Sequence, residues 1–136
     1  MPFVLDASIV HAWAFDERHP TATRVRRLLD SDRAYAPSLW WFEVRNGLIM
    51  AERRGRLSEH ETVRFLQDLS RLAITMDPAP DEGRVLALAR RLRLTVYDAA
   101  YLELAARERL PLATLDRALV EAARAEGVAL LSDAPA

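Results

Sequence analysis

The sequence lacks two reactive residue types entirely, because its 136 residues include no cysteine and no lysine. Without cysteine the chain can form neither disulfides nor thiolate–metal bonds. We expect no structural zinc site either, since only His11, His19 and His60 remain as nitrogen ligands. Without lysine the chain has no Walker-type P-loop and forms no Schiff base. All 19 of its basic residues are arginine.

Long apolar runs are also missing, and no stretch approaches the roughly 20 residues that cross a membrane. The opening segment, Met-Pro-Phe-Val-Leu-Asp, has no basic side chain and has an acidic residue where a signal peptide would be apolar. We therefore expect a cytoplasmic protein with no membrane partner. The length and the 51% apolar content suit a single domain, residues 1–136, with its own core.

Short apolar segments alternate with helical patterns along the chain. Ser58-x-x-Glu61 is a capping box that predicts a helix start, and Pro37 is expected to open a long helix that Gly55 ends. The expected strands cover residues 2–5, 34–36, 73–76, 111–113 and 128–131, and the expected helices cover 8–15, 20–29, 37–54, 58–71, 81–92, 95–109 and 117–126. This alternation predicts an α/β fold, in which right-handed crossovers build a mostly parallel sheet covered on both faces.

Three aspartates stand where expected strands end or expected helices begin. Asp6 and Asp116 each follow a strand, and Asp98 lies in the first turn of a helix. Each has a purely structural explanation, since aspartate is favoured at helix N-caps and Thr95-x-x-Asp98 can form a capping box. However, ligands of parallel α/β folds bind beyond the carboxyl ends of the strands, which is where Asp6 and Asp116 would meet.

Helix periodicity places Asp98 and a fourth acidic residue, Glu43, at the interior or its margin. Asp98 shares a helix side with Leu102 and Ala105, so its carboxylate points inward and needs partners. Glu43 lies beside the core stripe of the long helix, where Asn46 could hydrogen-bond it one turn later. The alternative for Glu43 is an ordinary solvated glutamate.

Each of these four acidic residues lies in a short motif. The motifs are Val4-Leu5-Asp6-Ala7-Ser8, Phe42-Glu43-Val44-Arg45-Asn46-Gly47-Leu48, Val96-Tyr97-Asp98-Ala99-Ala100-Tyr101 and Ala113-Thr114-Leu115-Asp116-Arg117-Ala118-Leu119. In this order and in a chain of this length they resemble the four acidic motifs of PIN-domain ribonucleases, and they are most similar to the VapC toxins of toxin–antitoxin pairs. The resemblance runs from the first strand to about Leu131 and implies a three-layer α/β/α domain with a small, mostly parallel sheet.

The resemblance also implies a site and its partners. The implied catalytic and metal-binding residues are Asp6, Glu43, Asp98 and Asp116, with Ser8, Asn46 and Thr114 in support. The implied cofactor is Mg²⁺ or Mn²⁺, and the implied substrate is RNA. VapC-like toxins also form homodimers and bind a cognate antitoxin that covers the acidic pocket, so both partners are expected here.

Elementary electrostatics gives the same carboxylates a reason to bind a cation. Two carboxylates about 4 Å apart repel by roughly 4 kcal/mol at an effective dielectric near 20. A hard divalent ion relieves that repulsion, can lower the pKa of a bound water and can neutralise a phosphodiester oxygen. This chemistry suits hydrolysis of an RNA phosphodiester, with either one metal ion or two.

The long helix has more apolar surface than one core contact needs. Phe42 and Ile49 lie roughly opposite Trp40 and Val44, and Trp41 lies between the two sides. This surface is either buried under the following helix or shared with another chain, in a homodimer or an antitoxin complex.

The sequence also has to be compared with other functional classes of small α/β protein. A phosphoryl-transfer domain of the receiver or haloacid-dehalogenase kind would rely on a lysine, and this chain has none. A PIN-fold nuclease of RNA processing without a toxin role, or a catalytically silent α/β binding module, would have the same fold. The net charge of −1 does not favour nucleic acid by itself, so RNA binding would depend on local arginine clusters.

Overall fold

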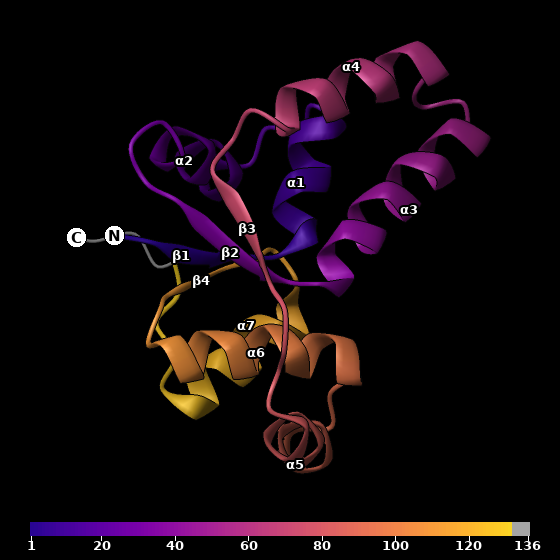
Figure 1. The fold of residues 1–136 in the computed structure, drawn as a ribbon. Coiled ribbons are helices and arrows are strands. Elements are labelled where there is room, and N and C mark those ends of the chain that lie inside the picture. Colours follow the sequence, from indigo (N-terminus) through magenta and orange to yellow (C-terminus); the bar gives the residue numbers. More distant parts are fainter. Residues whose placement is uncertain (132–136) are drawn as a thin grey trace.

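Four short parallel strands form the centre of the protein (Figure 1). The computed structural model describes residues 1–131. The strands are β1 (Phe3–Leu5), β2 (Ala34–Pro37), β3 (Ile74–Asp77) and β4 (Leu112–Ala113). They lie in the order β3-β2-β1-β4, and all three neighbouring pairs are parallel. The three residues of β1 are fully buried, as expected for a central strand covered on both faces.

Helices cover both faces of this sheet. They are α1 (Ala7–Ala14), α2 (Pro20–Leu28), α3 (Leu39–Arg53), α4 (Glu59–Leu69), α5 (Glu82–Leu92), α6 (Val96–Glu108) and α7 (Arg117–Glu126). In Figure 1, α1 to α4 lie above the sheet and α5 to α7 lie below it. The expected three-layer α/β/α architecture is confirmed. Within residues 1–131, no helix combines the length and the apolar character that a membrane span requires.

The order of the strands creates a crevice at one point of the sheet. The chain leaves β1 into α1 on one face, whereas it leaves β4 into α7 on the other face (Figure 1). Because β1 and β4 are parallel neighbours, the segments after them diverge from the same edge. Such a switch point is where open α/β sheets bind their ligands.

Local sequence signals explain most of the element boundaries. Ser58 and Glu61 form the expected capping box at the start of α4, and the helix before it ends ahead of Gly55, whose φ is +74°. The expectation that Pro37 opens a helix is wrong. Pro37 is the last residue of β2, where it pairs with Asp77, because its fixed φ also suits a strand end. The expected strand at 128–131 is reduced to a single bridge between Leu130 and Leu112.

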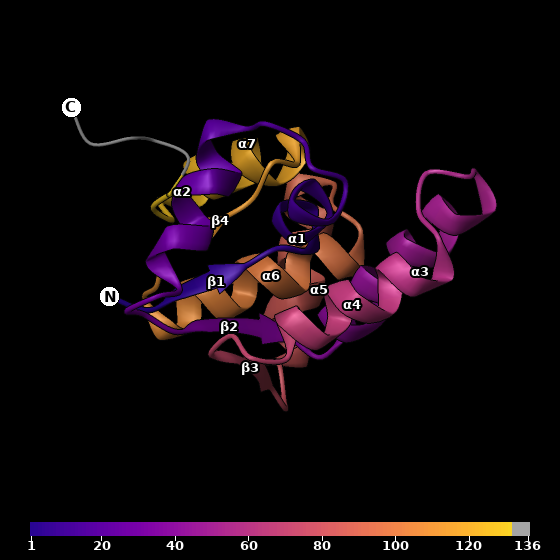
Figure 2. The same ribbon diagram turned by 90° about the horizontal axis from the view of Figure 1, so that it is seen from above.

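Helices α3 and α4 lead to a turn at the edge of the molecule in both views (Figures 1 and 2), and they spread apart from that turn in Figure 1. The following helix does not bury the outer apolar side chains of α3. Trp41, Phe42 and Ile49 remain 47%, 68% and 40% exposed. Of the two sequence-based alternatives for this surface, burial under the next helix is therefore excluded.

A buried ion-pair network fixes α6 against the end of β3. Glu103 is only 1% exposed, and its carboxylate accepts from the Arg107 guanidinium at 2.8 Å. Arg107 also pairs with Asp77 at 2.7 Å, and the Asp81 amide donates to Glu103 at 3.3 Å. Since a buried carboxylate needs such partners, this network holds the start of α5 and the body of α6 in one arrangement.

Candidate functional site

A cavity of about 300 Å³ lies at the carboxyl edge of the sheet, at the switch point between β1 and β4. Its lining brings together acidic residues from four different elements of the chain. The residues around it are Asp6, Ala7, Ser8, His11, Glu43, Asn46, Gly47, Asp98 and Asp116. The four acidic residues singled out from the sequence thus face one space, and Thr114 lies buried beside them.

Asp6 is fixed by the two strands that meet below the cavity. Its amide donates to the Ala113 carbonyl at 2.9 Å, which extends the β1–β4 pairing by one residue. Its side chain does not cap α1; instead Oδ2 accepts from the Ser8 hydroxyl at 2.5 Å and the Thr114 hydroxyl at 2.8 Å. Burial raises the pKa of Asp6, and the charge of Asp116 raises it more weakly. The hydrogen bonds from the Ser8 and Thr114 hydroxyls and from the Ser8 backbone lower it. Asp6 therefore occupies the N-cap position of α1 without a side-chain capping bond, and its carboxylate lines the cavity.

Ser8 and Thr114 connect Asp6 to the loop that carries Asp116. The Leu115 amide donates to the Ser8 hydroxyl at 2.9 Å, and the Asp116 amide donates to the Thr114 hydroxyl at 3.0 Å. Each hydroxyl therefore accepts from one backbone and donates to one carboxylate. This network holds the two strand ends at a fixed separation.

The other two aspartates combine a capping position with a place in the cavity. Asp116 is the N-cap of α7, and its Oδ1 accepts from the Leu119 amide at 3.0 Å. At the start of α6, Thr95 is the N-cap and accepts from the Asp98 amide at 3.1 Å. The Asp98 carboxylate does not complete a capping box but lines the cavity. At both helix starts, a role in helix capping is therefore compatible with a carboxylate that lines the cavity.

Glu43 reaches the cavity from α3 and is held by a residue that the sequence analysis did not single out. The Tyr101 hydroxyl, on α6, donates to Glu43 Oε1 at 2.6 Å. Burial raises the pKa of Glu43, this hydrogen bond lowers it, and the nearby aspartates raise it further. Burial and the same negative surroundings raise the pKa of Tyr101, so its hydroxyl keeps its proton. The expected Asn46–Glu43 hydrogen bond is not found in the described part of the chain, although Asn46 does line the cavity.

His11 holds the backbone of α3 against α1. Its Nε2 lies 3.1 Å from the Glu43 carbonyl and 3.2 Å from the Val44 carbonyl, and its ring stacks on Phe15. A Cβ at position 47 would lie within 3.0 Å of three atoms of this ring, so a larger residue there would require the ring to move. Gly47 weakens the helix interior, since glycine costs about 1 kcal/mol relative to alanine, but it permits this close approach.

Apart from His11, the described lining of the cavity contains no basic side chain. Burial, together with the charges of Asp116 and then Asp6, raises the pKa of Asp98 from 3.8 to about 6. Ionising all the carboxylates of this cavity is therefore unfavourable without an added cation.

The chemistry of these residues suits a hard divalent cation, because they offer carboxylate and hydroxyl oxygens and no soft ligand. Their side chains lie farther apart than the ligands of an occupied metal site do. Within residues 1–131, no group of three or more His, Asp or Glu side chains is gathered closely enough to hold an ion as it stands. The four carboxylates therefore line one cavity but do not converge on a single ion position.

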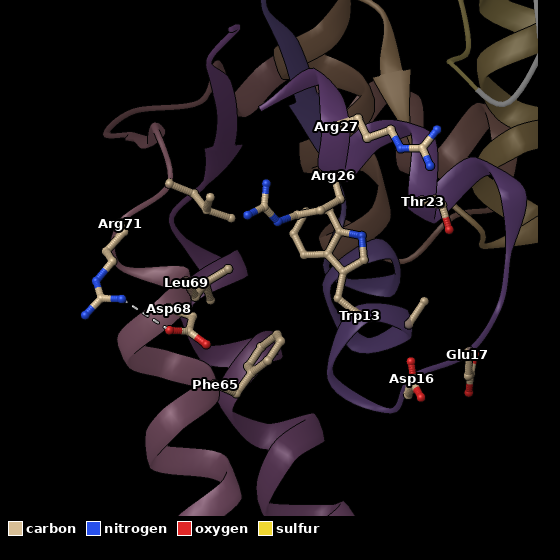
Figure 3. A pocket seen from close by; sticks show the side chains of 12 residues that line it. Trp13, Asp16, Glu17, Thr23, Arg26, Arg27, Phe65, Asp68, Leu69 and Arg71 are labelled. Atoms are coloured by element: carbon tan, nitrogen blue, oxygen red, sulfur yellow. Dashed lines mark hydrogen bonds and ion pairs between the residues drawn. The ribbon is translucent and has the colours of Figure 1, made fainter. Parts of the chain in front are cut away.

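A second, larger cavity of about 590 Å³ lies between α1, α2 and α4, away from the strand ends (Figure 3). Figure 3 shows Trp13 and Phe65 on either side of this space, with Arg26 on α2 above it. Asp68 forms an exposed ion pair with Arg71 at 3.5 Å in the same lining. None of the residues predicted for the site takes part in this cavity.

Fold and cavity together define a small doubly wound α/β domain with an acidic site at its switch point. Residues 3–125 match the PIN domain family, and the chain belongs to that family. Two curated relatives illustrate the likeness. Ribonuclease VapC3 of Pyrobaculum aerophilum is 34% identical over 125 residues, which cover 89% of this chain and 94% of the relative. Ribonuclease VapC9 of Mycobacterium tuberculosis is 32% identical over 108 residues, covering 76% and 80%.

Solved structures share the fold. The crystal structure of PAE2754 from Pyrobaculum aerophilum superimposes with a TM-score of 0.72 at 25% identity, covering 90% of this chain and 84% of that one. A chain of a toxin–antitoxin complex from Klebsiella pneumoniae superimposes with a TM-score of 0.57 at 21% identity, covering 84% and 86%. The second likeness concerns the architecture alone.

Proposed function

We propose that this protein is a metal-dependent endoribonuclease and the toxin of a toxin–antitoxin pair. The observation that carries the proposal is the meeting of four carboxylates from four elements in one cavity at the switch point of the sheet. The ribonuclease activity is supported by the names of the curated relatives, which are ribonucleases of the VapC group.

Mg²⁺ or Mn²⁺ would be held by Asp6, Glu43, Asp98 and Asp116. When bound, such an ion lowers the pKa of a coordinated water and neutralises a phosphodiester oxygen. In three of these residues, the side-chain hydrogen bonds described above fall on a single oxygen: Oδ2 of Asp6, Oε1 of Glu43 and Oδ1 of Asp116. These bonds orient the three carboxylates, which also line the cavity.

The hydroxyls of Ser8 and Thr114 support the site by orientation rather than by proton transfer. Each already donates to Asp6 and accepts from a backbone amide, so neither is available as a base. The Asn46 amide lies at the cavity with no side-chain partner in residues 1–131, which suits a contact to the substrate. With no lysine in the chain, contacts to RNA phosphates fall to arginine.

The metal proposal is tested by thermal unfolding and cleavage on one set of variants. Millimolar Mn²⁺ should raise the melting temperature of the wild type, and the wild type should cleave single-stranded RNA. Asp98→Asn should lose most of both responses, because it removes one charge and one ligand from the cavity. Asp68→Asn, in the larger cavity, makes the same chemical change outside the site and should behave as wild type. Equal Mn²⁺ shifts in all three proteins would contradict the metal site.

The toxin role is tested in a growing bacterium. Induced expression without the antitoxin should arrest growth, and Asp98→Asn should relieve the arrest at equal protein level. RNA cleavage in vitro without growth arrest would favour an RNA-processing nuclease instead. A folded wild type that binds Mn²⁺ but cleaves no RNA would favour a silent binding module. We also propose an antitoxin partner and a cytoplasmic location.

A homodimer is part of the proposal, through the outer face of α3. Three large apolar side chains, Trp41, Phe42 and Ile49, are exposed on this helix. Aromatic anchors of this kind are enriched at protein interfaces. Light scattering should therefore give a dimer at micromolar concentration, and Phe42→Glu should give a monomer. A monomeric wild type would contradict this interface.

A further inference from the structure

Tyr101 is the largest fully buried side chain among the described residues, and its hydroxyl bonds Glu43, which lines the acidic cavity. It lies on α6 one turn after Asp98, so one helix supplies both a carboxylate to the cavity and a donor to a second carboxylate. The hydroxyl donates to Glu43 Oε1 at 2.6 Å and so joins two helices from opposite layers of the domain. In Figure 1 the lower end of α3 and the first turn of α6 approach each other at this point.

Core packing alone does not require this hydroxyl. A phenylalanine ring would fill the same space without bringing a polar group into the core, and a buried phenol needs a hydrogen-bond partner. Tyr101 is 0% exposed, so it does not reach a substrate itself. The hydroxyl makes two contacts: it accepts from the Ala7 backbone amide and donates to Glu43, and only the second reaches a carboxylate of the cavity.

We propose that Tyr101 is a positioning residue that sets the orientation of the Glu43 carboxylate for metal binding. The inference rests on the proposed function, because it concerns the same site. With Oε1 held by Tyr101, the carboxylate presents Oε2 to the cavity as a single oxygen ligand. Side chains that orient metal ligands in this way typically change metal affinity by about 10- to 100-fold.

The backbone under Glu43 is held independently, which makes the side-chain bond effective. His11 Nε2 lies within 3.2 Å of the carbonyls of Glu43 and Val44, and Gly47 permits that approach. Glu43 is therefore fixed from α1 through its main chain and from α6 through its carboxylate. A glutamate fixed at both points loses little further rotamer freedom when it binds an ion.

Mn²⁺ binding to the apoprotein, measured by titration calorimetry or by the electron paramagnetic resonance of free Mn²⁺, tests this role without any substrate. Tyr101→Phe should weaken Mn²⁺ binding by about 10- to 100-fold. Tyr35→Phe is the matched control, since Tyr35 lies half-buried on β2 and its hydroxyl makes no hydrogen bond within residues 1–131. Tyr35→Phe should bind Mn²⁺ as the wild type does.

A double-mutant cycle separates positioning from a general loss of packing. In a Glu43→Ala background, Tyr101→Phe should cause no further loss of Mn²⁺ affinity, because the group through which it acts is gone. An equal loss in both backgrounds would assign Tyr101 a merely structural role and overturn the inference. Wild-type affinity in Tyr101→Phe would overturn it as well.

The same titrations distinguish failure of this inference from failure of the proposed function. If Asp98→Asn loses Mn²⁺ binding and Tyr101→Phe does not, only the role of Tyr101 is wrong. If the wild type itself binds no Mn²⁺, the metal site and the role of Tyr101 are both overturned.

Discussion

Two cavities of this protein differ in a way that size does not predict. The one between α1, α2 and α4 has about 590 Å³, and the acidic one at the strand ends has about 300 Å³. The larger has an aromatic lining and charges of both signs, including an ion pair between Asp68 and Arg71. The smaller is lined by four carboxyl groups and no arginine. The volume of a cavity is therefore a poor guide to the site.

The two cavities differ in how far their charged groups are exposed to solvent. The charges of the larger one are mostly exposed and can be solvated. In the smaller one, Asp6 is buried among other carboxylates and the pKa of Asp98 is raised to about 6. Proteins tolerate such local conflicts mainly where function requires them. The conflict, together with its place at the switch point, makes the smaller cavity the candidate site.

The largest expected difference between the cavities comes from Asp6→Asn. Because Asp6 is a proposed metal ligand, RNA cleavage with Mn²⁺ should fall by at least about 100-fold, more than a typical outer-sphere effect. The free energy of unfolding in EDTA should not fall, because the change removes a buried charge. Rate measurements and urea unfolding give the two values. Asp16→Asn, in the larger cavity, should leave cleavage unchanged, and equal rates for both variants would remove the distinction.

Gly47→Ala should have the next largest effect. The added methyl group would overlap the His11 ring and push α1 and α3 apart, at a cost of about 1–3 kcal/mol in the free energy of unfolding. Mn²⁺ affinity should fall as well, since Glu43 lies one turn away. Gly83→Ala is the matched control on α5, where the new Cβ would meet only Asp81 Oδ1 at 3.6 Å. A Gly47→Ala protein as stable as Gly83→Ala would show that the close approach is not needed.

The pH dependence of the metal-free protein should follow the acidic cavity. The pKa of Asp98 is about 6 in the folded chain against 3.8 for the free group. Between these values the folded state holds a proton that the unfolded state has lost, so stability falls as pH rises through this range. Urea unfolding in EDTA between pH 4 and about 7 measures this slope. Asp98→Asn should flatten it, and the same slope in this variant would assign it to other groups.

The smallest effect is expected from the arginines of the larger cavity. Arg27→Ala combined with Arg71→Ala should change the KM for RNA by no more than about twofold, as exposed substitutions away from a site do. Steady-state cleavage measures this value. A large rise in KM would assign the larger cavity to RNA binding.

The sequence predicted the elements well where local chemistry decided them. The capping box at Ser58 and the helix 117–126 are present as expected. Pro37 was misassigned because proline suits both a helix start and a strand end, and the pairing with β3 made the choice. The Glu43–Tyr101 bond was missed because its partners lie 58 residues apart, although Tyr101 follows Asp98 by one turn on the same helix.

By itself, the sequence determined the alternation of strands and helices, the caps and the identity of the acidic residues, because these depend on neighbours within a few positions. The tertiary structure alone decided that Oδ2 of Asp6 accepts both hydroxyl bonds, that Tyr101 holds Glu43 and that Gly47 lies against the His11 ring. These contacts join residues from different layers of the fold. Their geometry follows from how the helices pack on the sheet, which no local pattern encodes.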